Sequence, residues 1–352
     1  MDYFAGLDVS LEMTSICIVD ADGNVMKEAK VASEPDDLVA FFAQCGMAMK
    51  RIGLEAGASS QWLYGGMAEA GLPVVCIETR HAKAALSAMP NKTDRNDARG
   101  IANIMRTGWF RAVHVKTQTA QELRFLLVAR QTLVRKLMDI ELAIRGMLRS
   151  FGLKMGVVSK RNFEARVLEL AGDRAMLMRA LRPMLTARRA LALEYANLQK
   201  VAMDFARDDD VCRRLMTVPG VGPIVALTYR ATIDVPSRFR RSKSVGAHLG
   251  LTPRAYQSGE VDWNGRVSKS GDAMARAALY EAAHILLTRV KRWSSLKAWG
   301  LRLVKNRGHK RAVTALARRM SVLMHRIWVE GTVFIWKTGD GQVVAPAAVA
   351  EA

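Results

Sequence analysis

Short apolar runs separated by turn-forming residues dominate the first hundred positions. Residues 3–19 predict two strands around a short turn, and DADG at 20–23 predicts a hairpin turn into a third strand, NVMKEAKV. Helix and strand patterns then alternate, with a helix over 36–48, a strand over 51–55, a helix over 59–70 and a strand over 73–78. A strand meander followed by alternating helix and strand predicts an α/β domain with a mixed sheet.

From residue 118 the apolar spacing changes to alternating steps of three and four, which is typical of a long helix with one apolar seam. The first seam, in which Arg130 is the one polar position, contains Leu123, Leu126, Leu133, Leu137, Ile140, Ile144, Met147 and Phe151. A second contains Leu177, Leu181, Met184, Leu191, Tyr195, Leu198, Ala202 and Phe205, and Pro183 predicts a break or a start within it. Two seams predict an antiparallel helical hairpin or coiled coil, within the chain or, as we favour, between protomers.

The last third of the chain is patterned differently again. Residues 207–300 predict a mainly helical unit, 301–336 predict one basic amphipathic helix, and 337–352 predict a disordered tail of small and polar residues. In chain order, we therefore expect an α/β domain over 1–155 that includes the first long helix, then a helical coiled-coil segment over 156–206. The three C-terminal parts described above follow.

The charge of the chain is unevenly distributed. The formal net charge of the 352 residues is +20, yet residues 1–100 contain nine Lys and Arg against fourteen Asp and Glu. The remaining residues therefore carry an excess of +25. Because such an excess repels itself unless a polyanion neutralises it, nucleic acid is the expected partner; a solvated charged surface is the alternative.

Several classes of protein are not supported by the sequence. The cysteines are far apart and form no CxxC pair, so we expect neither a disulfide framework nor a zinc knuckle. The N-terminus lacks the pattern of a signal peptide, and no uncharged apolar run approaches the roughly 20 residues of a membrane span. We therefore expect a soluble, cytoplasmic protein with no membrane partner.

Four carboxylates in the acidic region are the leading candidates for chemistry: Asp8 in GLDVS, Glu55 in LEAG, and Asp94 and Asp97 in KTDRNDARG. Asp8 and Glu55 follow apolar strand residues, where an unpartnered carboxylate is costly to bury. Asp94 and Asp97 would share one face of a helix. Carboxylates are ligands for Mg²⁺, and two such ions can activate an attacking oxygen and stabilise a leaving one. The alternative for Asp94 and Asp97 is that they act as an N-cap and as a first-turn partner of the helix dipole.

PGVGP at residues 219–223 looks like the turn of a helix-hairpin-helix element. Gly220 and Gly222 would let backbone N–H groups approach a phosphate next to a helix N-terminus. An ordinary Gly/Pro turn is the alternative.

Residues 246–276 combine glycines, hydroxyls and cations. Ser258, in the predicted tight turn YQSG, could present its hydroxyl as a nucleophile, or it could make only a local turn bond. Ser268 and Ser270 in VSKSGD are rivals, although that segment could instead cap the following helix. The cations that could surround a phosphate are Arg254, Arg266, Lys269 and Arg276.

In their order and spacing, these motifs resemble the insertion-sequence 110 family of transposases. GLDVS, LEAG and KTDRNDARGIA are similar to its RuvC-like domain, while VPGVGP, LGLTPRAYQSGE and GRVSKSGDAMAR are similar to its C-terminal transposase domain. The resemblance implies a ribonuclease H-like N-terminal fold, which the strand order also fits. It implies an Asp-Glu-Asp-Asp site at Asp8, Glu55, Asp94 and Asp97 that holds two Mg²⁺ ions. It further implies a serine nucleophile, which maps best to Ser258.

The resemblance also implies partners. It implies recombination of donor and target DNA, guided by a structured non-coding RNA of the element, often called a bridge RNA, at the bacterial nucleoid. It implies a homo-oligomer, dimer or tetramer, in which the carboxylates of one protomer meet the serine of another. Two alternatives stay open: a nuclease of the Holliday-junction-resolvase type that attacks with metal-activated water, and a non-enzymatic scaffold that binds nucleic acid.

Overall fold

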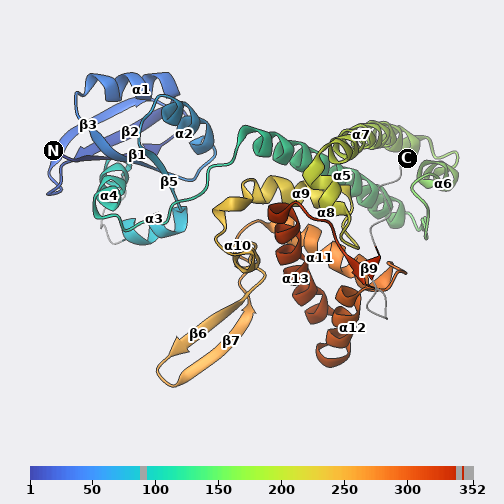
Figure 1. The fold of residues 1–352 in the computed structure, drawn as a ribbon. Coiled ribbons are helices and arrows are strands. Elements are labelled where there is room, and N and C mark those ends of the chain that lie inside the picture. The colour runs from blue at the N-terminus through green and yellow to red at the C-terminus, as the bar shows by residue number, and fades with distance from the viewer. Residues whose placement is uncertain (88–92, 338–342, 345–352) are drawn as a thin grey trace. The chain divides into compact units, whose positions relative to one another are not determined.

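The computed structural model describes residues 1–87, 93–337 and 343–344, and the chain forms two compact units, Met1–Lys116 and Thr117–Ala352 (Figure 1). The first unit is a mixed α/β structure and the second is mainly helical. In the part of the chain that is described, no helix is both long and apolar enough to cross a bilayer.

A five-stranded sheet in the order β3-β2-β1-β4-β5 lies at the centre of the first unit. Its strands are β1 (Tyr3–Val9), β2 (Met13–Val19), β3 (Val25–Ala32), β4 (Met49–Glu55) and β5 (Val74–Ile77). Its helices are α1 (Pro35–Gln44), α2 (Ser60–Glu69), α3 (Thr79–Leu86) and α4 (Asp94–Thr107). The first three strands form an antiparallel meander, and β4 and β5 run parallel to β1 and to each other. The predicted mixed sheet is therefore confirmed.

The sheet has an apolar core on each face, because successive side chains of a strand point to opposite sides. Ala5 and Leu7 of β1 belong to the core under α1 and α2, whereas Phe4 belongs to the core under α3 and α4. The helix predicted over 36–48 ends earlier, at Gln44. Gly46 has a φ of +62° just beyond it, which is a left-handed conformation suited to a helix end.

The two predicted seams form helices α5 (Gln118–Ser150) and α7 (Ala175–Asp208), with α6 (Phe163–Ala171) between them. Arg130 donates to the side chains of Tyr195 and Gln199, and Arg188 pairs with Glu141 further along, so the helices run antiparallel. The seams thus pair within the chain, which is the alternative that we did not favour.

Two details of the seams differ from the prediction. Met147 and Phe151 are exposed, whereas Leu148 is buried. The reason is that the buried side of α5 is the side that packs against the core residues of α6 and α7. Pro183 does not interrupt α7, whose helix continues through it. Leu181 and Leu185, on either side of Pro183, are buried in that core. Their packing compensates for the stability lost because proline cannot donate a backbone hydrogen bond.

The rest of the second unit is a helical body with one projecting hairpin (Figure 1). Its helices are α8 (Asp210–Met216), α9 (Pro223–Ile233), α10 (Val245–His248), α11 (Ala273–Thr288), α12 (Ser295–Arg307) and α13 (His309–Glu330), with 3-10 turns at Pro236–Arg238 and Ser242–Ser244. Its strands are β6 (Pro253–Ser258), β7 (Val261–Val267), β8 (Trp336–Lys337) and β9 (Val343–Val344).

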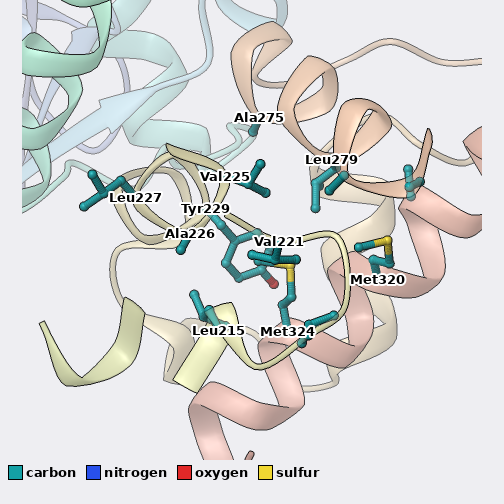
Figure 2. Close-up of a cluster of buried hydrophobic side chains, with 14 of the residues drawn as sticks. Leu215, Val221, Val225, Ala226, Leu227, Tyr229, Ala275, Leu279, Met320 and Met324 are labelled. Carbon is teal, nitrogen blue, oxygen red and sulfur yellow. The ribbon is translucent and has the colours of Figure 1, made fainter. Parts of the chain in front are cut away.

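Helices α9, α11 and α13 enclose the largest core of this unit (Figure 2). Tyr229 on α9 is buried there and donates its hydroxyl to the backbone oxygen of Ser321, 2.7 Å away. Leu123 and Leu127 of α5 belong to the same core. By its packing, α5 is therefore part of the second unit, whereas the sequence grouped it with residues 1–155.

The C-terminal region also differs from the single helix predicted over 301–336. Gly308, with a φ of +77°, separates α12 from α13, and α13 ends at Glu330 before Gly331. One face of α13 is buried, so this basic segment is a part of the core as well as a charged surface. Most of the tail predicted to be disordered lies outside the described residues; Lys337, Val343 and Val344 are the described part of it.

Candidate active site

Asp8 and Glu55 lie on neighbouring strands at the same edge of the first unit's sheet. β1 and β4 pair in parallel with Leu7 beside Leu54, so the two carboxylate residues follow side by side at the ends of these strands. Asp8 also pairs with Ser15 on β2, and Glu55 with Ile77 on β5. Both acidic residues are half-buried.

Two glycines let α4 lie directly on these strands. A Cβ at Gly6 would overlap the backbone of Ala98 and Ala102, and a Cβ at Gly53 would come within 2.6 Å of the Met105 side chain. Strand alternation places Asp8 on the same face as Gly6, and Glu55 on the same face as Gly53. The α4 face of the sheet is thus the face of both carboxylates.

The direction of α4 brings its N-terminus to the strand ends. Gly53 faces Ile101 and Met105, while Arg51, two residues earlier on β4, donates from Nη1 to the Met105 oxygen at 2.7 Å. The helix therefore runs antiparallel to β1 and β4, since later residues of α4 lie beside earlier residues of β4. Its first turn approaches the end of the sheet where Asp8 and Glu55 lie.

Asp94 and Asp97 are in that first turn. The N-cap is Thr93, whose hydroxyl accepts a hydrogen bond from the Asn96 backbone N–H at 3.2 Å, so neither acid is the capping residue. Asp94 lies four residues before Ala98, and Asp97 four before Ile101, so both continue the sheet-facing stripe of the helix. Asp97 is half-buried and Asp94 is exposed.

An ion pair that the sequence alone did not reveal fastens the same turn to the sheet. Arg95 of α4 pairs with Glu28 of β3. The hydrogen bond from Arg95 lowers the pKa of the Glu28 carboxyl below its usual value. The pair spans from the third strand to the first turn of the helix, so it holds in place the segment that carries Asp94 and Asp97.

The backbone therefore brings four carboxylates to one edge and one face of the sheet. Their oxygens are the hard donors that Mg²⁺ takes, and few protein carboxylates are needed when substrate and water complete the shell. The chemistry of these four donors fits such an ion, whereas their side chains are not gathered around one point in the structure. Within residues 1–87, 93–337 and 343–344, no three His, Cys, Asp or Glu side chains are grouped closely enough to form a metal centre.

Ser258 is the last residue of β6 in the second unit. It pairs with Val261, and the two residues between them, Gly259 and Glu260, form a tight turn. The turn predicted over residues 256–259 therefore lies slightly later, and Ser258 belongs to the strand that enters it. Gly259 has a φ of +56°, which suits a two-residue hairpin turn. Every residue of β6 is exposed, so the Ser258 hydroxyl is presented at the tip of a hairpin that extends away from the helices (Figure 1).

The rival serines are in a different environment. The hydroxyls of Ser268 and Ser270 are hydrogen-bonded to each other at 2.9 Å. Neither caps the next helix: Asp272 is the N-cap of α11, accepts from the Ala275 N–H at 2.8 Å and pairs with Arg124 of α5. The prediction that VSKSGD caps the following helix is therefore confirmed, and its last residue, Asp272, is the one that does so.

The four predicted phosphate-binding cations are not equivalent. Arg276 donates from Nη1 to three backbone oxygens that hold the serine loop, those of Leu249, Ser270 and Gly271. Arg254 makes one long hydrogen bond, 3.4 Å, to the Ser268 oxygen. Arg266 and Lys269 are exposed. Phosphate binding by this set stays a prediction.

The PGVGP segment does join two helices, α8 and α9. Gly220 has a φ of +89°, and a Cβ there would lie 2.4 Å from the Ala282 oxygen of α11. Gly222 is the N-cap of α9, and a Cβ added there would have no neighbouring atom within 4 Å. Packing against α11 thus accounts for Gly220, and phosphate contact at either glycine stays a prediction.

Comparisons with known proteins match both parts of the chain. The model described as "Transposase IS116/IS110/IS902 family" matches residues 212–298, and the model DEDD_Tnp_IS110, described as "Transposase", matches residues 5–152. The chain is 30% identical over 325 residues to the transposase for insertion sequence element IS1111A of Coxiella burnetii, covering 89% of this chain and 86% of that one. It is 24% identical to the transposase for IS1328 of Yersinia enterocolitica, covering 94% and 97%.

Among solved structures, RuvC of Thermus thermophilus matches 32% of this chain and 99% of its own, at 14% identity and a TM-score of 0.25, which is too low to support an argument. The relatives found by sequence are sufficient to assign the family without this structural match. Because one of them is 30% identical over most of both chains, and because two transposase models match in order, this chain belongs to the IS116/IS110/IS902 family of insertion-sequence transposases.

Proposed function

We propose that this transposase cleaves and rejoins DNA strands with Ser258 as the nucleophile, assisted by Mg²⁺ bound to Asp8, Glu55, Asp94 and Asp97. The observation that carries the proposal is the antiparallel run of α4 across β1 and β4, which brings its first-turn acids to the strand ends of the other two. The sheet order β3-β2-β1-β4-β5, with three antiparallel and two parallel strands, supports a ribonuclease H-like assignment for this unit.

Each group has a defined part in the chemistry. The four carboxylates would supply oxygen ligands, and two bound Mg²⁺ ions would supply stabilisation of charge on the attacked phosphate. Asp94 and Asp97 lie in the first turn of α4, where the helix dipole favours negative charge.

Ser258 would attack the phosphorus of a DNA phosphodiester. Its hydroxyl loses a proton, a bond forms between Oγ and phosphorus, and the bond from phosphorus to one sugar oxygen breaks; that sugar leaves as a hydroxyl after taking up a proton. The phosphoserine ester retains the energy of the broken bond. Attack by the sugar hydroxyl of another strand on the same phosphorus then rejoins DNA and releases the serine.

The partners follow from the charge and from the family resemblance. Residues 101–352 carry the entire excess of positive charge, which favours binding of phosphate backbones. We propose donor and target DNA as substrates, a structured RNA of the element as guide, and a homo-oligomer in which the acids of one protomer meet the serine of another. Because the family matches are to transposases, a junction-resolving nuclease that hydrolyses with water is the less favoured alternative.

The decisive experiment compares three serines. Wild type and the variants Ser258→Ala, Ser268→Ala and Ser270→Ala are incubated with donor DNA, target DNA, the element's RNA and Mg²⁺. We expect recombinant product, and a protein–DNA adduct that survives denaturation, from all except Ser258→Ala. Recombination by Ser258→Ala would exclude the assigned nucleophile, and cleaved ends without any adduct in the wild type would favour hydrolysis by water.

A further inference from the structure

The β6–β7 hairpin carries a stacked aromatic pair on one of its faces. Tyr256 pairs directly with Trp263 across the two strands. Their ring centroids are 4.3 Å apart and their planes differ by 14°. Gly265 leaves room for this arrangement, since a Cβ there would lie 2.8 Å from the Tyr256 ring. The pair is therefore a flat, preorganised aromatic surface.

This surface is open to solvent. The side chains of Tyr256 and Trp263 are 41% and 53% exposed, and neither belongs to the apolar clusters that the described residues form. Stacking across the strands stabilises the hairpin, as aromatic pairs do. The part of each ring that the stacking leaves uncovered is available to a ligand.

The aromatic pair lies on the same face as Ser258. Tyr256 and Ser258 are two residues apart on β6, so their side chains point to the same side, about 7 Å apart along the strand. Stacked nucleotides of one strand are about 3.4 Å apart. A DNA strand with its phosphate at Ser258 would therefore place a base within one or two nucleotides of that phosphate against the rings.

The charges of the hairpin fit the same ligand. Arg254 and Arg266 lie near its base and are exposed, and Lys269 follows just beyond β7. The acids Glu260 and Asp262 lie at the turn instead. Aromatic rings flanked by cations are the usual platform for single-stranded DNA, because every base has a π face and every nucleotide has a phosphate.

We propose that Tyr256 and Trp263 stack on an unpaired DNA base next to the phosphate that Ser258 attacks. The position of this base relative to the reaction rests on the proposed role of Ser258; the stacking itself does not. The base must be unpaired or at a strand end, since the faces of bases inside a duplex are covered by their neighbours. The pair would hold the strand in place while the hydroxyl reacts.

The test compares two double variants of the full-length chain. Tyr256→Phe with Trp263→Phe keeps the aromatic faces, while Tyr256→Ile with Trp263→Val keeps strand-forming side chains and a cross-strand contact but removes every π face. The probes are a fluorescent 20-nucleotide single-stranded DNA, a duplex of the same sequence and an RNA of the same sequence, with binding followed by anisotropy. Circular dichroism and sedimentation check the fold and the oligomeric state.

We expect the Phe variant to bind single-stranded DNA within about twofold of the wild type, and the Ile/Val variant to bind it about tenfold more weakly or worse. Duplex binding should change little. Equal binding of single-stranded DNA by wild type and Ile/Val variant would overturn the proposal. An equal loss of affinity for the duplex would also overturn it. A larger loss on RNA than on DNA would instead assign the rings to RNA, and a loss of self-association would assign them to a second copy of the chain.

A second measurement locates the base. 5-Iododeoxyuridine is placed at successive positions around the cleaved phosphate, and crosslinked peptides are identified by mass spectrometry. We expect crosslinks to Tyr256 or Trp263 from the positions within two nucleotides of that phosphate. Ser258→Ala should lose the covalent adduct and keep these crosslinks. An adduct that persists in Ser258→Ala would count against the proposed function, whereas crosslinks missing from these two rings would count against the stacking alone.

Discussion

Gly6 of β1 lies directly against Ala98 of α4, with no side chain between the strand and the helix backbone. This contact sets the height of α4 above the sheet. Because Asp8 is two residues further along β1 and Asp94 is one turn earlier on α4, the same contact sets how closely the two sets of acids approach. A strand glycine that admits another backbone is thus a determinant of the candidate metal site.

Replacing Gly6 by alanine should therefore disturb both stability and function. The new Cβ would overlap the helix backbone, and we expect a loss of about 1–3 kcal/mol in the free energy of unfolding of the first unit. Gly65 on α2, which has open space around it, is the matched control. Gly65→Ala should leave stability unchanged or raise it by up to about 1 kcal/mol. Urea unfolding of both variants checks this, and a Gly6→Ala protein as stable as wild type would contradict it.

The ion pair between Glu28 and Arg95 should matter more for activity than for stability. Pairs this exposed are worth up to about 1 kcal/mol, so a double-mutant cycle with Glu28→Gln and Arg95→Gln should give a small coupling energy. Recombination should fall in both single variants, because the first turn of α4 loses its anchor. Asp2 and Lys50, a 2.6 Å pair elsewhere in the same unit, are the control. Equal effects of Asp2→Asn and Glu28→Gln on recombination would refute a positioning role.

Substitution of the acids should be visible without any DNA. Asp97→Asn removes a negative charge both from the neighbourhood of other carboxylates and from the favourable N-terminal turn of α4, and these effects oppose each other, so it should melt close to the wild-type temperature in EDTA. Added Mg²⁺ should raise the melting temperature of the wild type and raise that of Asp97→Asn less, because ligand binding stabilises the folded state. Asp22→Asn, in the exposed β2–β3 turn, should respond to Mg²⁺ as the wild type does. Identical Mg²⁺ responses of Asp97→Asn and the wild type would argue against a metal ligand at this position.

His325 should make the second unit sensitive to mild acid. It is buried on α13, where one ring nitrogen contacts the Ser242 hydroxyl and the other the Pro236 oxygen, each at 3.0 Å. Burial lowers the pKa of His325 below 6.5, so the folded state binds its proton less readily than the unfolded state does. Stability from this group is therefore present above pH 6.5 and is lost as the pH falls below it, by at most about 1.4 kcal/mol per pH unit.

Urea unfolding at pH 7.5 and pH 5.5 measures this loss. His325→Gln, which can keep one hydrogen bond but does not titrate, should lose less stability between the two pH values than the wild type does. His114, a partly exposed histidine of the first unit, supplies the comparison through His114→Gln. If His325→Gln and His114→Gln showed the same pH dependence, the buried histidine would not be the cause.

The local pattern of the sequence determined the sheet of the first unit, but it did not predict α3 and it grouped α5 with this unit. Apolar runs along residues 3–9 and 13–19, the Asp20–Gly23 turn and the spacing of later elements were enough for the mixed sheet, because short apolar runs bounded by turn residues are typical of buried strands. The same pattern, with the family resemblance, selected the four acids and the serine as candidates. It also indicated two long helices, since a seam repeats over many turns.

What the pattern did not determine depends on contacts between distant segments. Leu148 is buried in place of Met147 because α6 and α7 approach that side of α5, and Pro183 stays helical because Leu181 and Leu185 are packed on each side of it. Gly308 divides the basic helix so that α12 and α13 can both cover the core. The approach of α4 to Gly6 and the stacking of Tyr256 on Trp263 are likewise decided by partners that are remote in the chain. The sequence indicates which residues can be buried or can react. Only the tertiary structure decides which of them are in contact, because close packing depends on all neighbouring side chains together.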